Sequence, residues 1–198
     1  MKKYIIAFLA LLSLPITGRA GDMKTNYEIA TFAGGCFWCM QPVFDELEGV
    51  TETNVGYSGG DKDDANYEAV SNKETAHYEA IQIKFTPQKI TYETLLEKFI
   101  RNIDPLDPLG QFADKGPQYK TAVFYHNNIQ KQVAEKFFAE IESMKILDGE
   151  IQTEILPYKN YFPAEEYHQK YYKKNSVHYN AYKYGSGRVD RLKEIWGE

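Results

Sequence analysis

Positions 27–57 of the chain read YEIATFAGGCFWCMQPVFDELEGVTETNVGY and contain its only two cysteines. Residues 27–33 predict a β-strand, residues 36–47 predict a helix, and residues 50–57 predict a second strand. Because proline fits best in the first turn of a helix, Pro42 suggests that the regular helix starts only near Cys39. The segment therefore predicts a strand, a helix and a strand in succession.

The rest of the chain continues with strands and helices. Further strands are predicted at 77–85, 119–126 and 151–158, and further helices at 91–103, 127–145 and 163–174. The first six elements follow the order β-α-β-β-α-β of the ferredoxin-like, split βαβ fold, in which both helices cover one face of a mixed sheet. We therefore expect an α+β protein with a two-layer ferredoxin-like core and an irregular, tyrosine-rich C-terminal tail.

Two long loops are predicted, one after Tyr57 and one after Asp104. Loops of this length in a compact domain usually carry function. We expect both loops to wrap the end of the sheet where Cys36 lies.

The two cysteines, Cys36 and Cys39, lie three positions apart at the predicted start of the first helix, with Phe37 and Trp38 between them. The helix dipole and the free N–H groups of the first turn favour a thiolate at such a position. Thiolate is the reactive form of cysteine, and lowering the pKa of a thiol from about 8.5 to about 7 gives roughly ten times more thiolate at neutral pH. The pattern predicts a lowered pKa for Cys36 and a redox active site.

The first 20 residues have the three parts of a secretory signal peptide. A short basic head, Met1-Lys2-Lys3, precedes an apolar run at 4–16 and a small-residue cleavage site that ends at Ala20. The apolar run is shorter than the ~20 residues that span a bilayer, although an uncleaved membrane anchor is the alternative. We expect an exported, soluble protein, most simply periplasmic, in which an oxidising environment favours a disulfide between the cysteines.

The composition excludes several kinds of partner. The chain has 198 residues with 23 basic and 28 acidic side chains, and its net charge is −5 at pH 7. This charge argues against nucleic acid or an anionic membrane surface as a partner. The length and the lack of an internal repeat predict one domain over residues 21–198, which we expect to be a monomer.

Glu79 stands out in the strand predicted at 77–85. Side chains in a strand alternate between two faces, which places Glu79 on the apolar face with Ile81, Ile83 and Phe85. A carboxyl group in apolar surroundings has a raised pKa and can donate a proton near neutral pH. Glu79 is therefore a candidate general acid, and a glutamate that reaches solvent at the end of the strand is the alternative.

The chain resembles the peptide methionine sulfoxide reductases of the A type over nearly all of residues 21–198. Enzymes of this kind return oxidised methionine to methionine, with one type for each sulfoxide epimer. The motifs that carry the resemblance are Gly35-Cys36-Phe37-Trp38, Gly56-Tyr57-Ser58-Gly59-Gly60, His77-Tyr78-Glu79-Ala80, Asp114 with Gly116, Gln118 and Tyr119, and His168-Gln169-Lys170-Tyr171. The resemblance implies a catalytic domain that acts on the S epimer of free or protein-bound methionine sulfoxide, and so repairs oxidised exported proteins.

The resemblance also implies a role for each matching residue. Cys36 matches the nucleophile that attacks the sulfoxide sulfur. Glu79 matches the acid that protonates the sulfoxide oxygen, while Tyr67 and Tyr119 match hydroxyl groups that hydrogen-bond this oxygen. Asp114 matches a carboxylate that orients the substrate and nearby water.

Three aromatic residues match the substrate pocket. Phe37 and Trp38 match the rings that hold the S-methyl group, through apolar and sulfur–aromatic contact. Tyr171 matches a tyrosine that lines the site. Lys115 and Pro117 depart from the family, which often has histidine and a small hydroxyl residue there.

The first turnover would leave Cys36 as a sulfenic acid. Many relatives resolve this acid with cysteines near the C-terminus, but no cysteine follows Cys39 in this chain. If the resolving thiol belongs to this chain it is Cys39, because residues three apart on a helix lie within the ~5–6 Å that a disulfide accepts. The disulfide would then need an external dithiol, such as an exported thioredoxin-like protein.

Three other interpretations use the same cysteines. A thioredoxin-like thiol-disulfide oxidoreductase also has Cys-x-x-Cys after a strand, but this function gives no role to Glu79. A zinc module needs two more ligands at regular spacing, whereas His126, His168 and His178 are scattered and are interpreted as surface or packing residues. The third is a secreted domain with one stapling disulfide, which would add little stability in so short a loop. We expect no metal ion and no cofactor.

Overall fold

The computed structural model describes residues 27–197. The predicted signal peptide at 1–20 lies outside the described residues and stays a prediction. A six-stranded sheet forms the centre of the protein, in the order β7-β6-β1-β3-β2-β8. Its strands are β1 (Glu28–Gly34), β2 (Val50–Ser58), β3 (Tyr78–Phe85), β6 (Thr121–Tyr125), β7 (Glu154–Pro157) and β8 (Phe162–Pro163). A separate short hairpin consists of β4 (Gly110–Gln111) and β5 (Asp114–Lys115).

The strand order is that of a split βαβ unit, because β3 lies between β1 and β2. Strand β3 is antiparallel to both neighbours, and the pairing sets Phe32 opposite Ile81 and Tyr57 opposite Glu79. Strand β7 pairs in parallel with β6, so the sheet as a whole is mixed. The predicted α+β class is confirmed.

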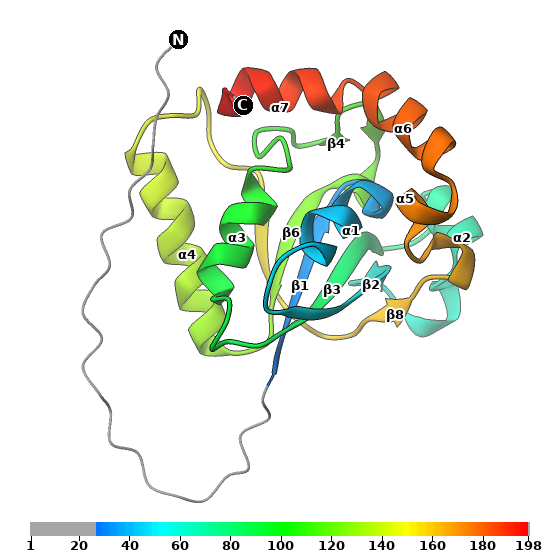
Figure 1. Ribbon diagram of the computed structural model, residues 1–198, viewed down its shortest axis with the longest axis horizontal. Helices are drawn as coiled ribbons and strands as arrows, with labels where there is room; N and C mark the ends of the chain where they lie inside the picture. The colour runs from blue at the N-terminus through cyan, green and yellow to red at the C-terminus, as the bar shows by residue number, and fades with distance from the viewer. Residues whose placement is uncertain (1–26, 198) are drawn as a thin grey trace, which may run out of the picture.

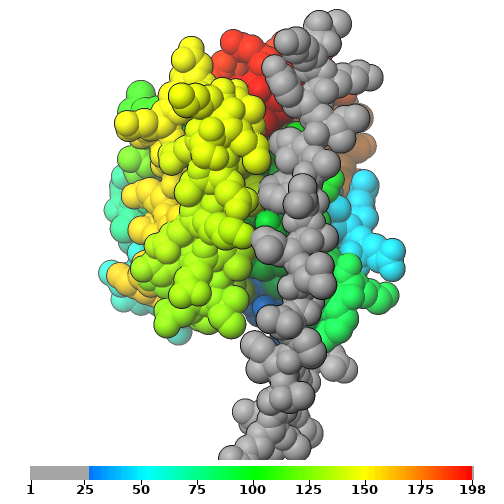
Figure 2. All heavy atoms as spheres, turned by 90° about the vertical axis from the view of Figure 1, so that its left-hand side faces the viewer, coloured from blue at the N-terminus to red at the C-terminus, as the bar shows by residue number. Residues whose placement is uncertain are grey.

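Three helices pack on one face of the sheet: α1 (Phe37–Asp45), α3 (Tyr92–Ile100) and α4 (Asn128–Ser143). Helices α3 and α4 lie side by side (Figure 1), and α4 forms much of the outer surface on that side (Figure 2). Phe32 and Phe99 are fully buried in this layer and stack with ring centroids 4.9 Å apart. Asparagine and threonine caps start α4 and α3, since the side chains of Asn127 and Thr91 accept the N–H groups of the first turn.

The segment before β8 crosses the opposite face of the sheet. The Tyr161 hydroxyl donates to the carbonyl of Asn54 over 2.5 Å. Gly56 has no room for a side chain, because a Cβ there would lie 2.3 Å from the Phe162 carbonyl oxygen. The glycine of the Gly56-Tyr57 motif therefore allows this close crossing.

Helix α1 differs from the prediction at its start. It begins at Phe37 rather than near Cys39, and Pro42 lies inside it. The proline has no N–H to donate to the carbonyl four residues before, that of Trp38. The helix forms despite this missing hydrogen bond because Phe37, Met40 and Phe44 are buried.

The C-terminal tail is helical, so the prediction of an irregular tail was wrong. It contains α5 (Tyr171–Lys174), α6 (Ser176–Gly185) and α7 (Arg188–Trp196), which lie along one edge of the molecule (Figure 1). In place of one helix at 163–174, the chain has β8, a 3₁₀ turn at Glu166–His168 and α5. Gly187 separates α6 from α7 in the left-handed conformation, with φ of 76°. Among residues 27–197, no helix has the length and apolar character needed to cross a membrane.

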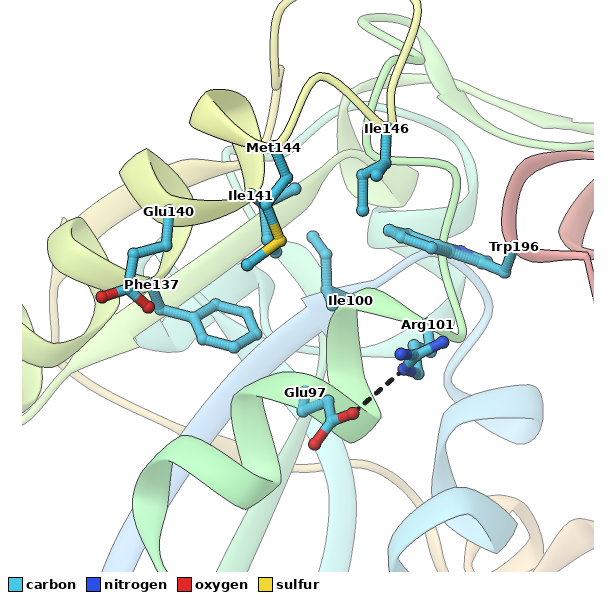
Figure 3. A pocket seen from close by; sticks show the side chains of 9 residues that line it. All are labelled: Glu97, Ile100, Arg101, Phe137, Glu140, Ile141, Met144, Ile146 and Trp196. Carbon is cyan, nitrogen blue, oxygen red and sulfur yellow. Dashed lines mark hydrogen bonds and ion pairs between the residues drawn. The ribbon is translucent and has the colours of Figure 1, made fainter. Parts of the chain in front are cut away.

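Trp196 fixes the end of α7 in an apolar groove (Figure 3). Its indole lies beside Ile146 at the mouth of the groove, and its Nε1 donates to the carbonyl of Ile103 over 3.4 Å. The guanidinium of Arg101 lies 5.8 Å from the ring centroid. The end of the chain is therefore packed onto α3 and the loop after it.

We expect Trp196→Ala to lower the free energy of unfolding by about 2 kcal/mol, because it removes a large, partly buried ring. Urea denaturation measures this change. The control is Val177→Ala, since Val177 is 84% exposed on α6 and its truncation should matter by less than ~0.5 kcal/mol. Equal urea midpoints for both variants would contradict the anchoring role of Trp196.

Candidate active site

The cysteine pair lies where β1 passes into α1. Cys36 is the N-cap residue of α1 and Cys39 lies one turn further, with its N–H bonded to the Cys36 carbonyl over 3.0 Å. Both thiols are free and nearly buried, with 7% and 4% of their surface exposed. Gly35 precedes the pair with φ of +75°, and a Cβ there would lie 2.6 Å from Gln111. Glycine is therefore required for the tight turn that presents Cys36.

The prediction of a lowered pKa for Cys36 was wrong. Burial raises its pKa well above the ordinary value, and the hydrogen bond to Cys39 and the charges of Glu79 and Asp114 raise it further. A thiolate in a dry, acidic environment is disfavoured even at a helix N-terminus. The sequence pattern revealed the helix but neither the burial nor the acidic neighbours.

Cys39 carries the lowered pKa instead. The hydrogen bond from Cys36 lowers the pKa of Cys39 to about 7, against the effect of burial, and the positive charge of Arg188 adds to the lowering. Near neutral pH, the first proton that the pair loses therefore comes from Cys39. Passing one proton along the Cys36–Cys39 hydrogen bond would then place the negative charge on Cys36.

Glu79 lies beside this pair at the start of β3. It is 2% exposed, and its Oε2 accepts the backbone N–H of Phe37 over 3.0 Å. Burial raises the pKa of Glu79 to about 8, with Asp114 and Cys39 adding to the shift and the Phe37 N–H opposing it. The predicted rise in its pKa is confirmed, and Glu79 holds a proton at neutral pH.

We expect Glu79→Gln to stabilise the protein at pH 7 by roughly 2–3 kcal/mol. A carboxyl group with a raised pKa binds more protons in the folded than in the unfolded state. Its stability contribution is therefore complete below pH 4.5 and is lost as the pH rises to about 8. Glutamine can accept the same Phe37 N–H and has no proton to lose.

Urea unfolding between pH 5 and pH 8 measures the effect, which should grow with pH. The matched control is Glu52→Gln, because the side chain of Glu52 is 57% exposed on β2. A gap between Glu79→Gln and wild type that does not change with pH would contradict a buried, neutral Glu79.

The two long loops bring phenol groups to the same place, as predicted. Tyr67 begins the short helix α2 (Tyr67–Ser71), and its N–H donates to Oε1 of Glu165 over 2.9 Å. Tyr119 ends a 3₁₀ turn at Pro117–Tyr119. Burial, and then the charge of Glu79, raise the pKa of Tyr67 to about 12 and also raise the pKa of Tyr119. Both hydroxyl groups therefore remain protonated donors in the pocket of Glu79.

Asp114 on β5 is connected to the cysteine pair by the hydroxyl group of Tyr182. The Tyr182 hydroxyl donates to Oδ2 of Asp114 and also forms a hydrogen bond with Cys36. Burial raises the pKa of Asp114, and the hydrogen bond from Tyr182 opposes the rise. Tyr182 was missed, because nothing in the sequence distinguishes it from the other tyrosines of the tyrosine-rich C-terminal tail.

Aromatic rings enclose the site on its outer side. Phe37 is buried between Tyr57 and His168, with centroids 6.0 and 5.0 Å away. The Trp38 ring stacks on Tyr171 at 3.9 Å, and its Nε1 donates to Nδ1 of His168 over 2.9 Å. The structure thus brings together the three aromatic residues that were predicted to bind substrate.

His168 was interpreted correctly as a packing residue, but it also positions a predicted pocket residue. It is 1% exposed, and burial lowers its pKa, so a neutral ring accepts the Trp38 N–H. Glu165 was missed. Its carboxylate accepts the Tyr57 hydroxyl over 2.8 Å as well as the Tyr67 N–H, and so ties β2 to α2.

Neither departure from the family pattern changes these contacts. Lys115 is exposed and pairs with Asp107, and Pro117 opens the 3₁₀ turn before Tyr119. Among residues 27–197, no group of three or more His, Cys, Asp or Glu side chains could hold a metal ion.

Comparison with known proteins places this arrangement in a family. The MsrA peptide methionine sulfoxide reductase of Bacillus subtilis is 47% identical over 175 residues, which cover 88% of this chain and 99% of that protein. The MsrA/MsrB protein of Vibrio cholerae is 49% identical over 174 residues, which cover 88% of this chain. The chain spans only 46% of the length of that longer protein.

A solved structure agrees with the sequence comparison. Reduced Mxr1 from Saccharomyces cerevisiae superposes with a TM-score of 0.71 at 31% identity, and the match covers 76% of this chain and 87% of the yeast chain. Residues 28–198 match the family described as peptide methionine sulfoxide reductase. Because this match extends over nearly the whole described chain and the relatives carry the MsrA name, this chain belongs to the peptide methionine sulfoxide reductase family, A type.

Proposed function

We propose that this protein reduces the S epimer of methionine sulfoxide, free or in proteins, to methionine. The observation that carries the proposal is the buried Glu79, which holds a proton at neutral pH beside Cys36 and the hydroxyl groups of Tyr67 and Tyr119. A nucleophilic sulfur, an acid and two hydrogen-bond donors are the groups that a sulfoxide needs. Disulfide exchange of the thioredoxin kind gives no role to this acid.

In the first step, the Cys36 sulfur attacks the sulfoxide sulfur after its proton passes to Cys39. Glu79 gives its proton to the sulfoxide oxygen, and the hydroxyl groups of Tyr67 and Tyr119 share the charge that develops there. The oxygen moves to Cys36 as a sulfenic acid, and methionine leaves. Phe37 and Trp38 hold the S-methyl group of the substrate during this step.

In the second step, Cys39 attacks the Cys36 sulfenic acid, which gives a disulfide and water. The first turn of α1 must open to bring the two sulfur atoms together. This opening is favoured because Pro42 has no N–H for the Trp38 carbonyl, so the turn is held by one helical hydrogen bond fewer.

A thioredoxin-like dithiol would then reduce the disulfide by exchange. Yeast Mxr1 has been solved in complex with Trx2. This likeness supports thioredoxin as the class of reductant to test first.

We also propose that the protein acts outside the cytoplasm. The basic head, the apolar run at 4–16 and the small residues before position 21 support a cleaved signal peptide. Cell fractionation tests this directly. A periplasmic protein that begins near Gly21 is expected, and a cytoplasmic protein that retains Met1 would contradict export.

The test of the activity uses racemic methionine sulfoxide with dithiothreitol as the reductant. We expect half of the racemate to be consumed, with the R epimer left over, and thioredoxin to replace dithiothreitol. Reduction of insulin disulfides without any formation of methionine would instead support the thioredoxin-like function.

A further inference from the structure

Arg188 is a buried cation that has no role in the reaction steps proposed above. It is the first residue of α7 and is 3% exposed. Helix α7 is fixed near the active site, because Arg191 forms an ion pair with Asp104 over 2.7 Å, and Trp196 lies in the groove described above. The backbone of Arg188 is therefore held in place by contacts other than its own side chain.

The partners of the Arg188 guanidinium are all neutral. Its Nη1 donates to the carbonyl of Asn102 over 2.6 Å, and its Nη2 donates to the carbonyl of Gly34 over 3.3 Å. The group lies over the ring of Phe112, 4.4 Å from the centroid, and its Nε is buried with no hydrogen-bond partner in the described part of the chain. Within residues 27–197, no carboxylate forms an ion pair with it. A buried charge without a counter-ion is unfavourable.

The cysteine pair can supply the missing negative charge. Gly34, which accepts from Arg188, lies two residues before Cys36, and the positive charge of Arg188 contributes to the lowered pKa of Cys39. The Nη2 atom also lies 3.7 Å from where a Cβ of Gly35 would be, so the guanidinium sits against the turn that carries the cysteine pair. The charge of Arg188 also favours the ionised forms of Asp114 and Tyr179, so among the described residues Cys39 is one of three ionisable groups on which it acts.

Other charges act on Cys39 from the elements packed around it. Lys183 on α6 favours the thiolate, and Asp114 on β5 disfavours it. Glu79 on β3 and Tyr179 on α6 are also within electrostatic reach, since a charge on Cys39 raises the pKa of each. Lys183 is only partly buried, whereas Arg188 is almost wholly buried and so is screened least by solvent.

We propose that Arg188 is a positioning residue for the resolving step, whose buried guanidinium holds the negative charge on the Cys39 sulfur. This inference rests on the proposed function, in which Cys39 resolves the oxidised Cys36. The Cys39 thiolate attacks the sulfur of the Cys36 sulfenic acid, so that an S–S bond forms and the S–O bond breaks. The departing hydroxide takes one proton from solvent, or from Glu79 once Glu79 has taken up the proton that Cys39 released, and leaves as water.

The first experiment reads the pairing of Arg188 and Cys39 without any turnover. In a Cys36→Ser background, Cys39 is the only thiol, and the serine hydroxyl still offers it a hydrogen bond. The rate of alkylation by iodoacetamide is measured against pH with Arg188→Met, Arg188→Lys and, as the matched control, Arg191→Met. Arg191 lies on the same helix and pairs with Asp104 instead of facing the cysteines.

Arg188→Met is expected to raise the midpoint of the alkylation profile by about one pH unit, because a neighbouring opposite charge shifts a pKa by roughly 1–3 units. Arg191→Met should leave the midpoint unchanged, and Arg188→Lys, which keeps the charge, should stay within about half a unit. An unchanged midpoint in Arg188→Met would overturn the proposal. If Arg188→Met does not fold, the alkylation profile of Arg188→Lys tests the proposal. Lysine keeps the positive charge, so a rise of a full pH unit in its midpoint would also overturn the proposal.

A single turnover with Cys36 restored separates this proposal from the proposed function. In Arg188→Met, release of methionine should stay within about twofold of wild type, while disulfide formation slows about tenfold. Equal slowing of both steps would overturn the role of Arg188 in resolution. If wild type releases no methionine, the proposed function fails, whatever the alkylation profile gives.

Discussion

Cys36→Ser is expected to abolish sulfide formation, whereas Cys39→Ser is expected to stop after one turnover. Serine is a far weaker nucleophile than a thiolate, and loss of a nucleophile typically costs 10³-fold or more. Cys39→Ser keeps the attacking sulfur and loses only the thiol that resolves its sulfenic acid. With a thioredoxin as the reductant, both variants should therefore lose steady-state activity, but for different reasons.

Mass spectrometry after one dose of methyl p-tolyl sulfoxide, with no reductant, distinguishes the two variants. Wild type should form one sulfide per enzyme and lose about 2 mass units as its disulfide closes. Cys39→Ser should form the same amount of sulfide and gain about 16 mass units as a sulfenic acid, while Cys36→Ser should do neither. A sulfenic acid on wild-type Cys36 would discard Cys39 as the resolver, and sulfide from Cys36→Ser would discard Cys36 as the nucleophile.

Local sequence patterns were sufficient to predict the core of the fold. The helix predicted at 91–103 lies within a few residues of the observed α3, and the alternation along β3 gave its buried face. The same approach failed in the C-terminal tail, where α6 buries only Tyr179 and α7 buries only Arg188. Helix α7 is held instead by the ion pair of Arg191 with the distant Asp104 and by the groove around Trp196.

The active site was predictable where one segment carries the signal. The face of Glu79 follows from its own strand, and its raised pKa follows from that face. The pKa of Cys36 was predicted wrongly because it depends first on burial, and then on Cys39 and on the charges of Glu79 and Asp114, which come from separate strands. Arg188 is a similar case, since it lies 154 positions from the carbonyl it binds at Gly34. No local pattern reports such contacts.

The chemistry of Glu79 gives the second large expected effect. Glu79→Gln should keep partial activity, because its amide can still donate a hydrogen bond to the sulfoxide oxygen while its carbonyl accepts the Phe37 N–H. Glu79→Ala has no donor and leaves the Phe37 N–H without its partner, so it should lose about 10³-fold in kcat/KM, within the 10²–10⁴ that a general acid contributes. The rate of sulfide formation under single-turnover conditions measures both variants.

The pH dependence tests the same role with a defined sign. Wild type should lose activity as the pH rises through about 8, because Glu79 gives up the proton that the sulfoxide oxygen needs. Glu79→Gln has no such proton, so its rate should not fall in that range, and the exposed control Glu52→Gln should follow wild type. Equal rates for Glu79→Gln and Glu79→Ala would remove Glu79 as the acid. A fall above pH 8 that persists in Glu79→Gln would assign the titration to another group, with the tyrosines that surround the sulfoxide oxygen as the next to test.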